Sequence, residues 1–220
     1  NIMEDVRKGK GIKPDNLKVL NENNIPEWYI NSCNKIKYMF PKAHATAYVM
    51  HAWKFAWYKL NYPLEYYASY FSIRPTSFNI KTICKGLDAI KEHYLEINQK
   101  IKQKKEVSTK EKDLLPIYEV AIEMHLRGFK FKMVDINQSD ANHFLIDKEE
   151  YALICPLVVL DGLGEAVASS IIEARKKRPF ENLADLINRT KVSKQHIELF
   201  SQLGITDHLE EFNQIKLFDI

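Results

Sequence analysis

The chain has 220 residues, of which 45% are hydrophobic and 28% charged, with a formal net charge of +3. These values are typical of a soluble globular protein, and no run of 18 apolar residues indicates a membrane span. Three scattered cysteines and seven histidines show no metal-ligand spacing. We therefore expect a cytoplasmic protein with reduced thiols and no membrane segment. A first residue other than methionine suggests a piece of a larger protein.

The charge is unevenly distributed along the chain. Residues 1–75 carry eleven Lys or Arg against six Asp or Glu, whereas residues 195–220 carry one against five. The basic first part favours a polyanionic partner and the acidic end favours a different partner. The alternative is that both are simply solvated surface.

The first 75 residues are expected to be helical. Breaks at Gly9, Gly11 and Pro26 indicate short helices. Apolar and aromatic residues spaced three to four apart then predict a long helix over 43–60. The aromatic-rich stretch PLEYYASYF follows as a further helix that ends near Arg74.

The composition changes after Pro75. Two helical blocks are separated by a Lys-rich link at 102–112, and Gly128 is expected to stop the second block. The stretches FKFKMVDI, NHFLID and YALICPLVVL predict short strands, and residues 161–208 return to short helices. The fold class is therefore mainly α with a small β element: a helical portion followed by an α+β domain.

The stretch LDGLGEAVASSIIEAR, residues 160–175, predicts a phosphate-binding turn. Gly162 and Gly164 allow a tight turn around an inward-pointing Leu163, and Glu165 and Ala166 begin the next helix. The N–H groups and the positive end of the helix dipole then cradle one phosphate. The pattern resembles the helix–hairpin–helix element, which grips the DNA backbone without reading sequence. The alternative is a tight turn between helices with no ligand.

A second, degenerate copy is expected within LINRTKVSKQHIELFSQLGI. Ser193 is a plausible cap for a helix over 194–203, but the turn lacks the Gly-x-Gly pattern. We expect it to be a structural partner of the first hairpin. It would bring Lys191 and Lys194 near the phosphates.

Two further motifs have both a functional and a structural interpretation. In QIKLF, Gln214, Leu217 and Phe218 form the kind of short peptide that anchors in a hydrophobic pocket, or they fold back onto the domain. In FPKAH, Lys42 and His44 stand at the start of the long helix, where they face phosphate or are a solvated loop residue and a cap.

Taken in chain order, these stretches resemble the bacterial replicative DNA polymerase III alpha subunit of the PolC type. EDVRKGKG, IPEWYINSC, KYMFPKAHATAYV and YYASYFSIR resemble its fingers region, DLLPIYEVAIEMHLRGFKF and DGLGEAVASSIIEAR its duplex-binding domain, and NQIKLF its C-terminal clamp-binding peptide. The resemblance implies a C-terminal fragment. Its expected domains are part of the fingers at 1–75, a duplex DNA-binding domain at 76–208 with helix–hairpin–helix at 155–208, and a flexible clamp-binding tail at 209–220.

The resemblance also implies partners and roles. The partners are primer–template duplex DNA, the sliding clamp (beta subunit) and the remainder of the polymerase chain, on which the aromatic helix 43–60 should pack. Lys42 and His44 would lie near the nascent base pair. Gly162 to Glu165 would grip phosphate, and Gln214, Leu217 and Phe218 would bind the clamp. Lys216 and the two residues after Phe218 depart from the usual clamp motif.

The parent protein would be a nucleotidyltransferase that uses Mg²⁺ held by carboxylates. No Asp-x-Asp pair occurs in the chain, so we expect no catalytic residue and no cofactor in this fragment. Two rival interpretations remain. One is a helix–hairpin–helix DNA-repair enzyme, which would need its own catalytic centre, and the other is a helical protein-binding adaptor that ignores DNA.

Overall fold

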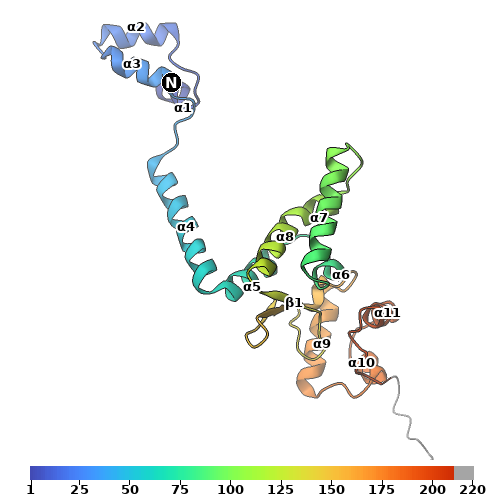
Figure 1. Ribbon diagram of the computed structural model, residues 1–220. Coiled ribbons are helices and arrows are strands. Elements are labelled where there is room, and N and C mark those ends of the chain that lie inside the picture. Colours follow the sequence, from blue (N-terminus) through green and yellow to red (C-terminus); the bar gives the residue numbers. More distant parts are fainter. Residues whose placement is uncertain (211–220) are drawn as a thin grey trace, which may run out of the picture. The chain divides into compact units, whose positions relative to one another are not determined.

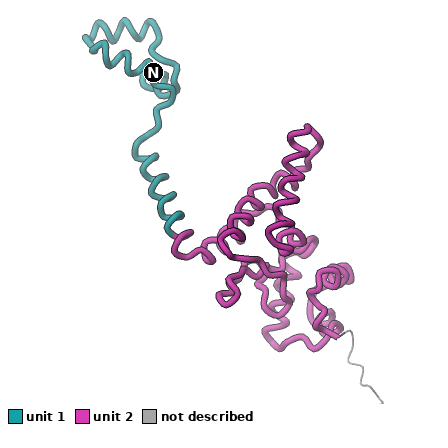
Figure 2. The backbone as a smooth tube through the Cα atoms, viewed as in Figure 1, with its two compact units in different colours: residues 1–57 teal, residues 58–220 magenta. Residues whose placement is uncertain are grey.

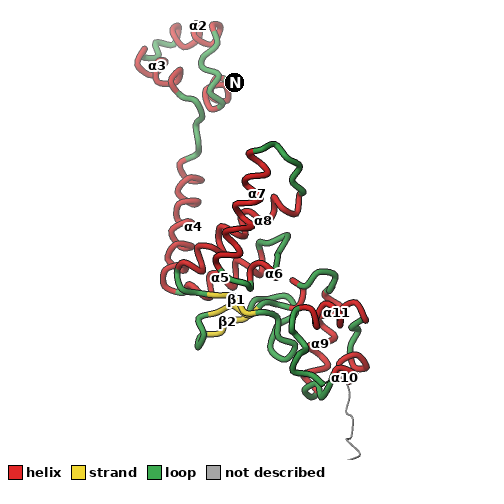
Figure 3. The backbone as a smooth tube through the Cα atoms, turned by 45° about the vertical axis from the view of Figure 1, so that its right-hand side comes forward, coloured by secondary structure: helices red, strands yellow, loops and turns green. Residues whose placement is uncertain are grey.

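The computed structural model describes residues 1–210, and the chain divides into two compact units, 1–57 and 58–220 (Figure 2). Helices predominate and one small sheet is present, which confirms the expected fold class (Figure 3). The expected domain boundaries at 75/76 and 208/209 refer to domains of a polymerase and stay predictions. In the structure, residues 58–75 belong to the second compact unit.

The first unit contains short helices separated at the predicted breaks (Figure 1). Gly9 has a φ of +72°, and a Cβ there would overlap the carbonyl oxygen of Lys37. Glycine is therefore required where this turn meets the segment before the long helix. The Met39 N–H donates to the Arg7 carbonyl at 3.0 Å and joins the same two segments. The helices are α1 (Ile2–Arg7), α2 (Pro14–Glu22) and α3 (Glu27–Lys35), and α4 (Lys42–Asn61) begins in this unit and ends in the second.

Helix α4 matches the predicted long helix but buries none of its residues. Its periodicity thus predicted the helix correctly, whereas the apolar side chains that form the pattern face solvent. Such a large exposed apolar set is typical of a surface that meets another protein surface. The exposed apolar residues of α4 are Tyr48, Val49, Met50, Trp53, Phe55, Trp57, Tyr58 and Leu60.

The second unit opens with helices packed around a shared core. Helices α7 and α8 lie side by side, and Lys100 of α7 pairs with Glu111 of α8 at 2.6 Å (Figure 1). Ser108 and Glu111 form a capping box at the start of α8. Gly128 has a φ of +88° and ends α8 as predicted. The helices are α5 (Pro63–Ile73), α6 (Ile80–Ile83), α7 (Leu87–Lys102) and α8 (Thr109–Leu126).

A three-stranded sheet follows in the order β1-β3-β2 (Figure 3). Strand β1 (Lys130–Lys132) runs parallel to β3 (Ala152–Ile154), and β2 (Leu145–Asp147) runs antiparallel to it. The strands are shorter than the sequence predicted. After β3, Pro156 has no N–H to donate to a neighbouring strand, and the chain turns into the 3-10 helix η1 (Leu157–Val159).

Three helices complete the second unit: α9 (Glu165–Lys177), α10 (Leu183–Arg189) and α11 (Lys194–Gln202). Arg175 of α9 donates to the carbonyl oxygens of Ile136 and Gln138, at 3.0 and 3.1 Å. It therefore holds α9 against the segment that follows β1. Among the described residues, no helix is both long enough and apolar enough to cross a membrane.

Candidate nucleic-acid interface

The predicted Gly-Leu-Gly turn is present and is tight. Gly162 has a φ of +81°, a conformation that favours glycine. The Leu163 N–H donates to the Leu160 carbonyl at 3.0 Å, and the Leu163 side chain is buried at 3% exposure. The side chain thus points inward as the pattern predicts, and it fixes the turn while the glycines on either side remain exposed.

Gly164 caps α9 without any side-chain hydrogen bond. Its φ is −77°, and a Cβ there would meet no atom within 4 Å. The missing side chain therefore leaves open space outside the helix end. The N–H groups of Val167 and Ala168 both donate to the Gly164 carbonyl, at 3.0 and 3.1 Å. The two amides before them, at Glu165 and Ala166, are at the positive end of the helix, where anions bind.

The side chains of the first turn do not block this helix end. Glu165 accepts a hydrogen bond from the Asn142 side chain at 3.1 Å, so its carboxylate is turned toward the loop before β2. Ala166 is exposed, and the buried small residues of this helix are Ala168 and Ala174. The residues Gly162, Gly164, Glu165 and Ala166 together form an exposed backbone surface.

The degenerate second hairpin packs against the first. Ser193 caps α11 as predicted, and its N–H donates to Nδ1 of His196 at 3.0 Å. Since Nδ1 accepts this bond, the neutral ring carries its proton on Nε2, which donates to the Gly162 carbonyl at 3.3 Å. The Lys191 N–H donates to Ser170 Oγ of α9 at 2.9 Å.

These contacts join the segments that carry two predicted residues to the first hairpin. Lys191 and Lys194 are exposed, and each belongs to a segment with a backbone or capping contact to the first hairpin. The positions of the two hairpins thus agree with the predicted arrangement, whereas contact with phosphate stays a prediction.

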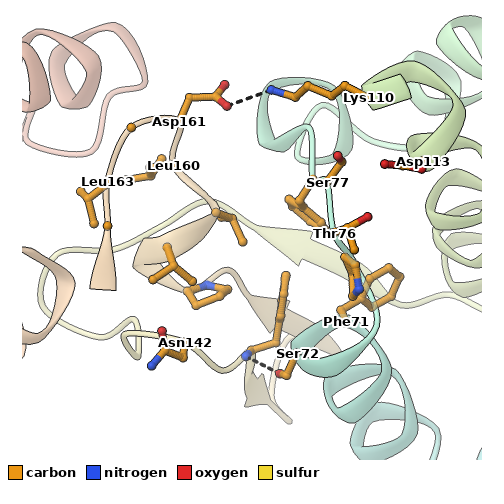
Figure 4. A pocket seen from close by; sticks show the side chains of 18 residues that line it. Phe71, Ser72, Thr76, Ser77, Lys110, Asp113, Asn142, Leu160, Asp161 and Leu163 are labelled. Carbon is orange, nitrogen blue, oxygen red and sulfur yellow. Dashed lines mark hydrogen bonds and ion pairs between the residues drawn. The ribbon is translucent and has the colours of Figure 1, made fainter. Parts of the chain in front are cut away.

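The structure adds a cation that the sequence pattern did not indicate. Lys110, in the first turn of α8, extends to Asp161, and its Nζ lies 3.0 Å from Oδ1 (Figure 4). The two side chains are 60% and 78% exposed, so water screens the pair and its contribution to stability is small. No local motif links residues that lie 51 positions apart in the chain. His196 and Asn142 were missed for the same reason.

A cleft of about 750 Å³ opens beside the turn. The hairpin segment 160–164 forms one wall and residues 75–78, between α5 and α6, form another (Figure 4). Lys110 and Asp161 meet across its mouth in this view. The cleft and the hairpin turn therefore share residues and form one continuous surface.

The remaining predicted residues lie elsewhere. Lys42 and His44 are exposed in the first turn of α4, in the first compact unit. The His44 ring lies 4.9 Å from the ring of Phe40 and 4.4 Å from that of Tyr48, centroid to centroid. The predicted clamp-binding residues Gln214, Leu217 and Phe218 lie outside the described residues.

The tight turn at Gly162–Gly164 and the helix α9 that follows it are similar to a helix–hairpin–helix motif. The family model described as a helix-hairpin-helix motif matches residues 128–215.

The chain as a whole is similar to a segment of a named polymerase. It is 54% identical over 220 residues to "DNA polymerase III PolC-type" of Ureaplasma parvum. Proteins of the same name from Lacticaseibacillus paracasei and Thermotoga maritima are 47% and 46% identical. These alignments cover 99–100% of this chain but only 15% of each relative. They confirm the resemblance to the PolC-type polymerase, and this chain corresponds to about 15% of the length of those relatives.

Proposed function

We propose that the chain is part of a DNA-directed DNA polymerase and that its second unit holds duplex DNA by the sugar–phosphate backbone. The observation that carries this proposal is the exposed first turn of α9, where Glu165 and Ala166 are exposed and a Cβ on Gly162 or Gly164 would meet no atom within 4 Å. Similarity to PolC-type relatives along the whole chain supports it.

The hairpin site suits phosphate rather than base recognition. Backbone N–H groups at a helix end carry no pattern that distinguishes one base pair from another. Lys191 and Lys194 add positive charge on the neighbouring hairpin. Binding should therefore be independent of sequence and should weaken steeply as salt rises, because each neutralised phosphate releases counterions.

Catalysis belongs to other parts of such a polymerase. Among residues 1–210, no group of three or more His, Cys, Asp or Glu side chains has the arrangement of a metal site. We propose that the parent protein holds the Mg²⁺ ions of a polymerase outside this chain. By the same resemblance, we propose that Lys42 and His44 lie close to the nascent base pair.

A substitution of Lys110, which lies beside the hairpin turn, tests whether this surface binds phosphate. We expect Lys110→Ala to lower affinity for a duplex and to reduce the slope of log K against log salt by about 1, since one phosphate contact is lost. Asp161→Asn should raise affinity, because it removes an anion from the turn. Fluorescence anisotropy of a labelled duplex across a salt series measures both effects.

Lys112 provides the matched control for this test. It is exposed on the same turn of α8 but lines a different, smaller hollow with Tyr70 and Arg74. Lys112→Ala should leave the slope almost unchanged. Equal slopes for Lys110→Ala and the parent chain would contradict a phosphate contact by Lys110. Cleavage of DNA by the chain alone would instead favour a repair enzyme, and binding of a protein partner without DNA would favour an adaptor.

We further propose that Gln214, Leu217 and Phe218 bind the sliding clamp. The double variant Leu217→Ala/Phe218→Ala should weaken clamp binding at least about tenfold, because both side chains would leave an apolar pocket. Surface plasmon resonance with immobilised clamp measures this effect. Ile220→Ala, an apolar truncation outside the motif, is the control, and both variants should bind DNA normally. Unchanged clamp affinity in the double variant would refute the proposal.

A further inference from the structure

We infer that the cleft beside the hairpin turn receives an unpaired nucleotide of the DNA strand whose phosphate the hairpin holds. This inference rests on the proposed function, since it takes the hairpin as the site that brings the strand to the cleft. It adds a distinct ligand: a base that has left the duplex stack. The inference is based on the residues that line the cleft, on the volume of the cleft and on its continuity with the hairpin turn.

The floor of the cleft is apolar and partly open to solvent. Pro75, Phe78, Val158 and Val159 line it and are each partly exposed. The Phe78 ring lies 5.3 Å, centroid to centroid, from the ring of Phe144, which is buried and also lines the cleft. A flat apolar base gains from leaving water against such a surface, and base stacking on aromatic rings does not depend on sequence.

The rim of the cleft is polar. Thr76 is exposed, while Ser77, Asp113 and Asn142 are partly exposed around the same opening (Figure 4). Hydroxyl, amide and carboxylate groups at the edge of an apolar pocket suit the donors and acceptors on the edge of a base. By contrast, Ser72 is fully engaged in the fold, since its hydroxyl donates to the Ala68 carbonyl and accepts from the Phe144 N–H.

The position of the cleft favours a nucleotide over an unrelated ligand. Gly162 and Gly164 belong to both the hairpin turn and the cleft wall, so a phosphate on the first turn of α9 brings its own sugar and base to the cleft. Lys110 stands at the mouth, 3.0 Å from Asp161, where it can turn to a second phosphate. The volume of about 750 Å³ is within the range of small-molecule sites. A paired base is held in the stack, so only an unpaired base can enter.

The test compares two duplexes that differ by one extrahelical nucleotide. One duplex is fully paired, and the other carries a single bulged 2-aminopurine, whose fluorescence reports its surroundings. We expect the 220-residue chain to bind the bulged duplex roughly tenfold more tightly than the paired one. We also expect 2-aminopurine emission to change on binding.

Filling the cleft separates this effect from hairpin binding. Thr76→Trp should remove the preference for the bulged duplex and leave affinity for paired DNA unchanged. Ser201→Trp introduces the same side chain at an exposed position of α11 outside the cleft, and it should keep the preference. The 2-aminopurine emission of the unmodified chain tests the inference even if a variant fails to fold.

The possible failures are distinguishable. Equal affinity for both duplexes, or a preference that persists in folded Thr76→Trp, would overturn the inference while the proposed function stands. Failure to bind the paired duplex at low salt would overturn the proposed function, and the inference with it.

Discussion

Replacing Glu165 by proline is expected to weaken binding of duplex DNA by about tenfold or more. Proline removes the backbone N–H at the first position of α9, which the proposal assigns to phosphate, and hydrogen bonds to charged groups contribute about 1.5–3 kcal/mol. The helix itself should tolerate the change, because proline suits the first helical position. Gly164 already has the extended conformation, φ −77° and ψ 165°, that a residue before proline prefers.

Two other variants show whether the N–H or the side chain matters at this position. Glu165→Ala keeps the N–H and removes a carboxylate, so it should bind DNA as well as the parent chain or slightly better. A Cβ at Gly164 would meet no atom within 4 Å, and the position has no left-handed φ, so we expect Gly164→Val to fold normally and to obstruct the approach of a phosphate. Titration by fluorescence anisotropy compares all three. If Glu165→Pro bound as tightly as Glu165→Ala, the amide would have no role.

Replacing Arg189 by methionine is expected to lower the free energy of unfolding of the second unit by about 3 kcal/mol. Its guanidinium donates to the carbonyl oxygens of Ala174, Arg178 and Pro179 around the end of α9. It also pairs with Asp185 at 2.7 Å. Methionine fills a similar volume, so the loss would come from carbonyls left without their donor and from the absence of one of the two cations that pair with Asp185, which keeps Arg178 at 2.8 Å.

Arg189→Lys is the matched control for this prediction. It keeps the charge but lacks the planar fork that reaches several acceptors at once, and the stacking of the guanidinium on Phe180, 5.0 Å away, is weakened. Its unfolding free energy should lie between those of Arg189→Met and the parent chain. Urea denaturation followed by circular dichroism measures the series. An unchanged midpoint for Arg189→Met would show that the connection between α9 and α10 does not depend on this residue.

Local patterns predicted much of the hairpin. Gly162 requires a positive φ, Leu163 is the apolar residue between two glycines, and Ser193 is a capping residue. Each of these signals lies within a few residues of the structure that it determines. The sequence alone was therefore sufficient to predict these three features.

The contacts that complete the site were not predictable in this way. Lys110 and Asn142 approach the turn from α8 and from the loop before β2, and only the tertiary fold brings them there. The floor of the cleft is assembled from Pro75, Phe78 and Val158, which no local pattern connects. The lengths of the strands were overestimated. Alternation of apolar and polar residues does not show where the neighbouring strand ends and backbone pairing stops.

Helix α4 shows a different limit. Its apolar spacing predicted a helix correctly, yet the same spacing predicts burial, and Trp53 and Leu60 are 74% and 73% exposed. The periodicity records that a surface is apolar and does not identify what covers it. Relatives of which this chain represents 15% have ample additional length to do so, and the expectation that α4 packs on the remainder of a polymerase stays a prediction.

The most direct test of the central claim is the salt dependence of binding to two duplexes of equal length and unrelated sequence. If the chain holds the DNA backbone through the hairpin, both duplexes should bind with nearly equal affinity. In both cases log K should fall linearly with log salt. Affinity for one sequence only, or affinity that does not change with salt, would contradict backbone binding through this surface.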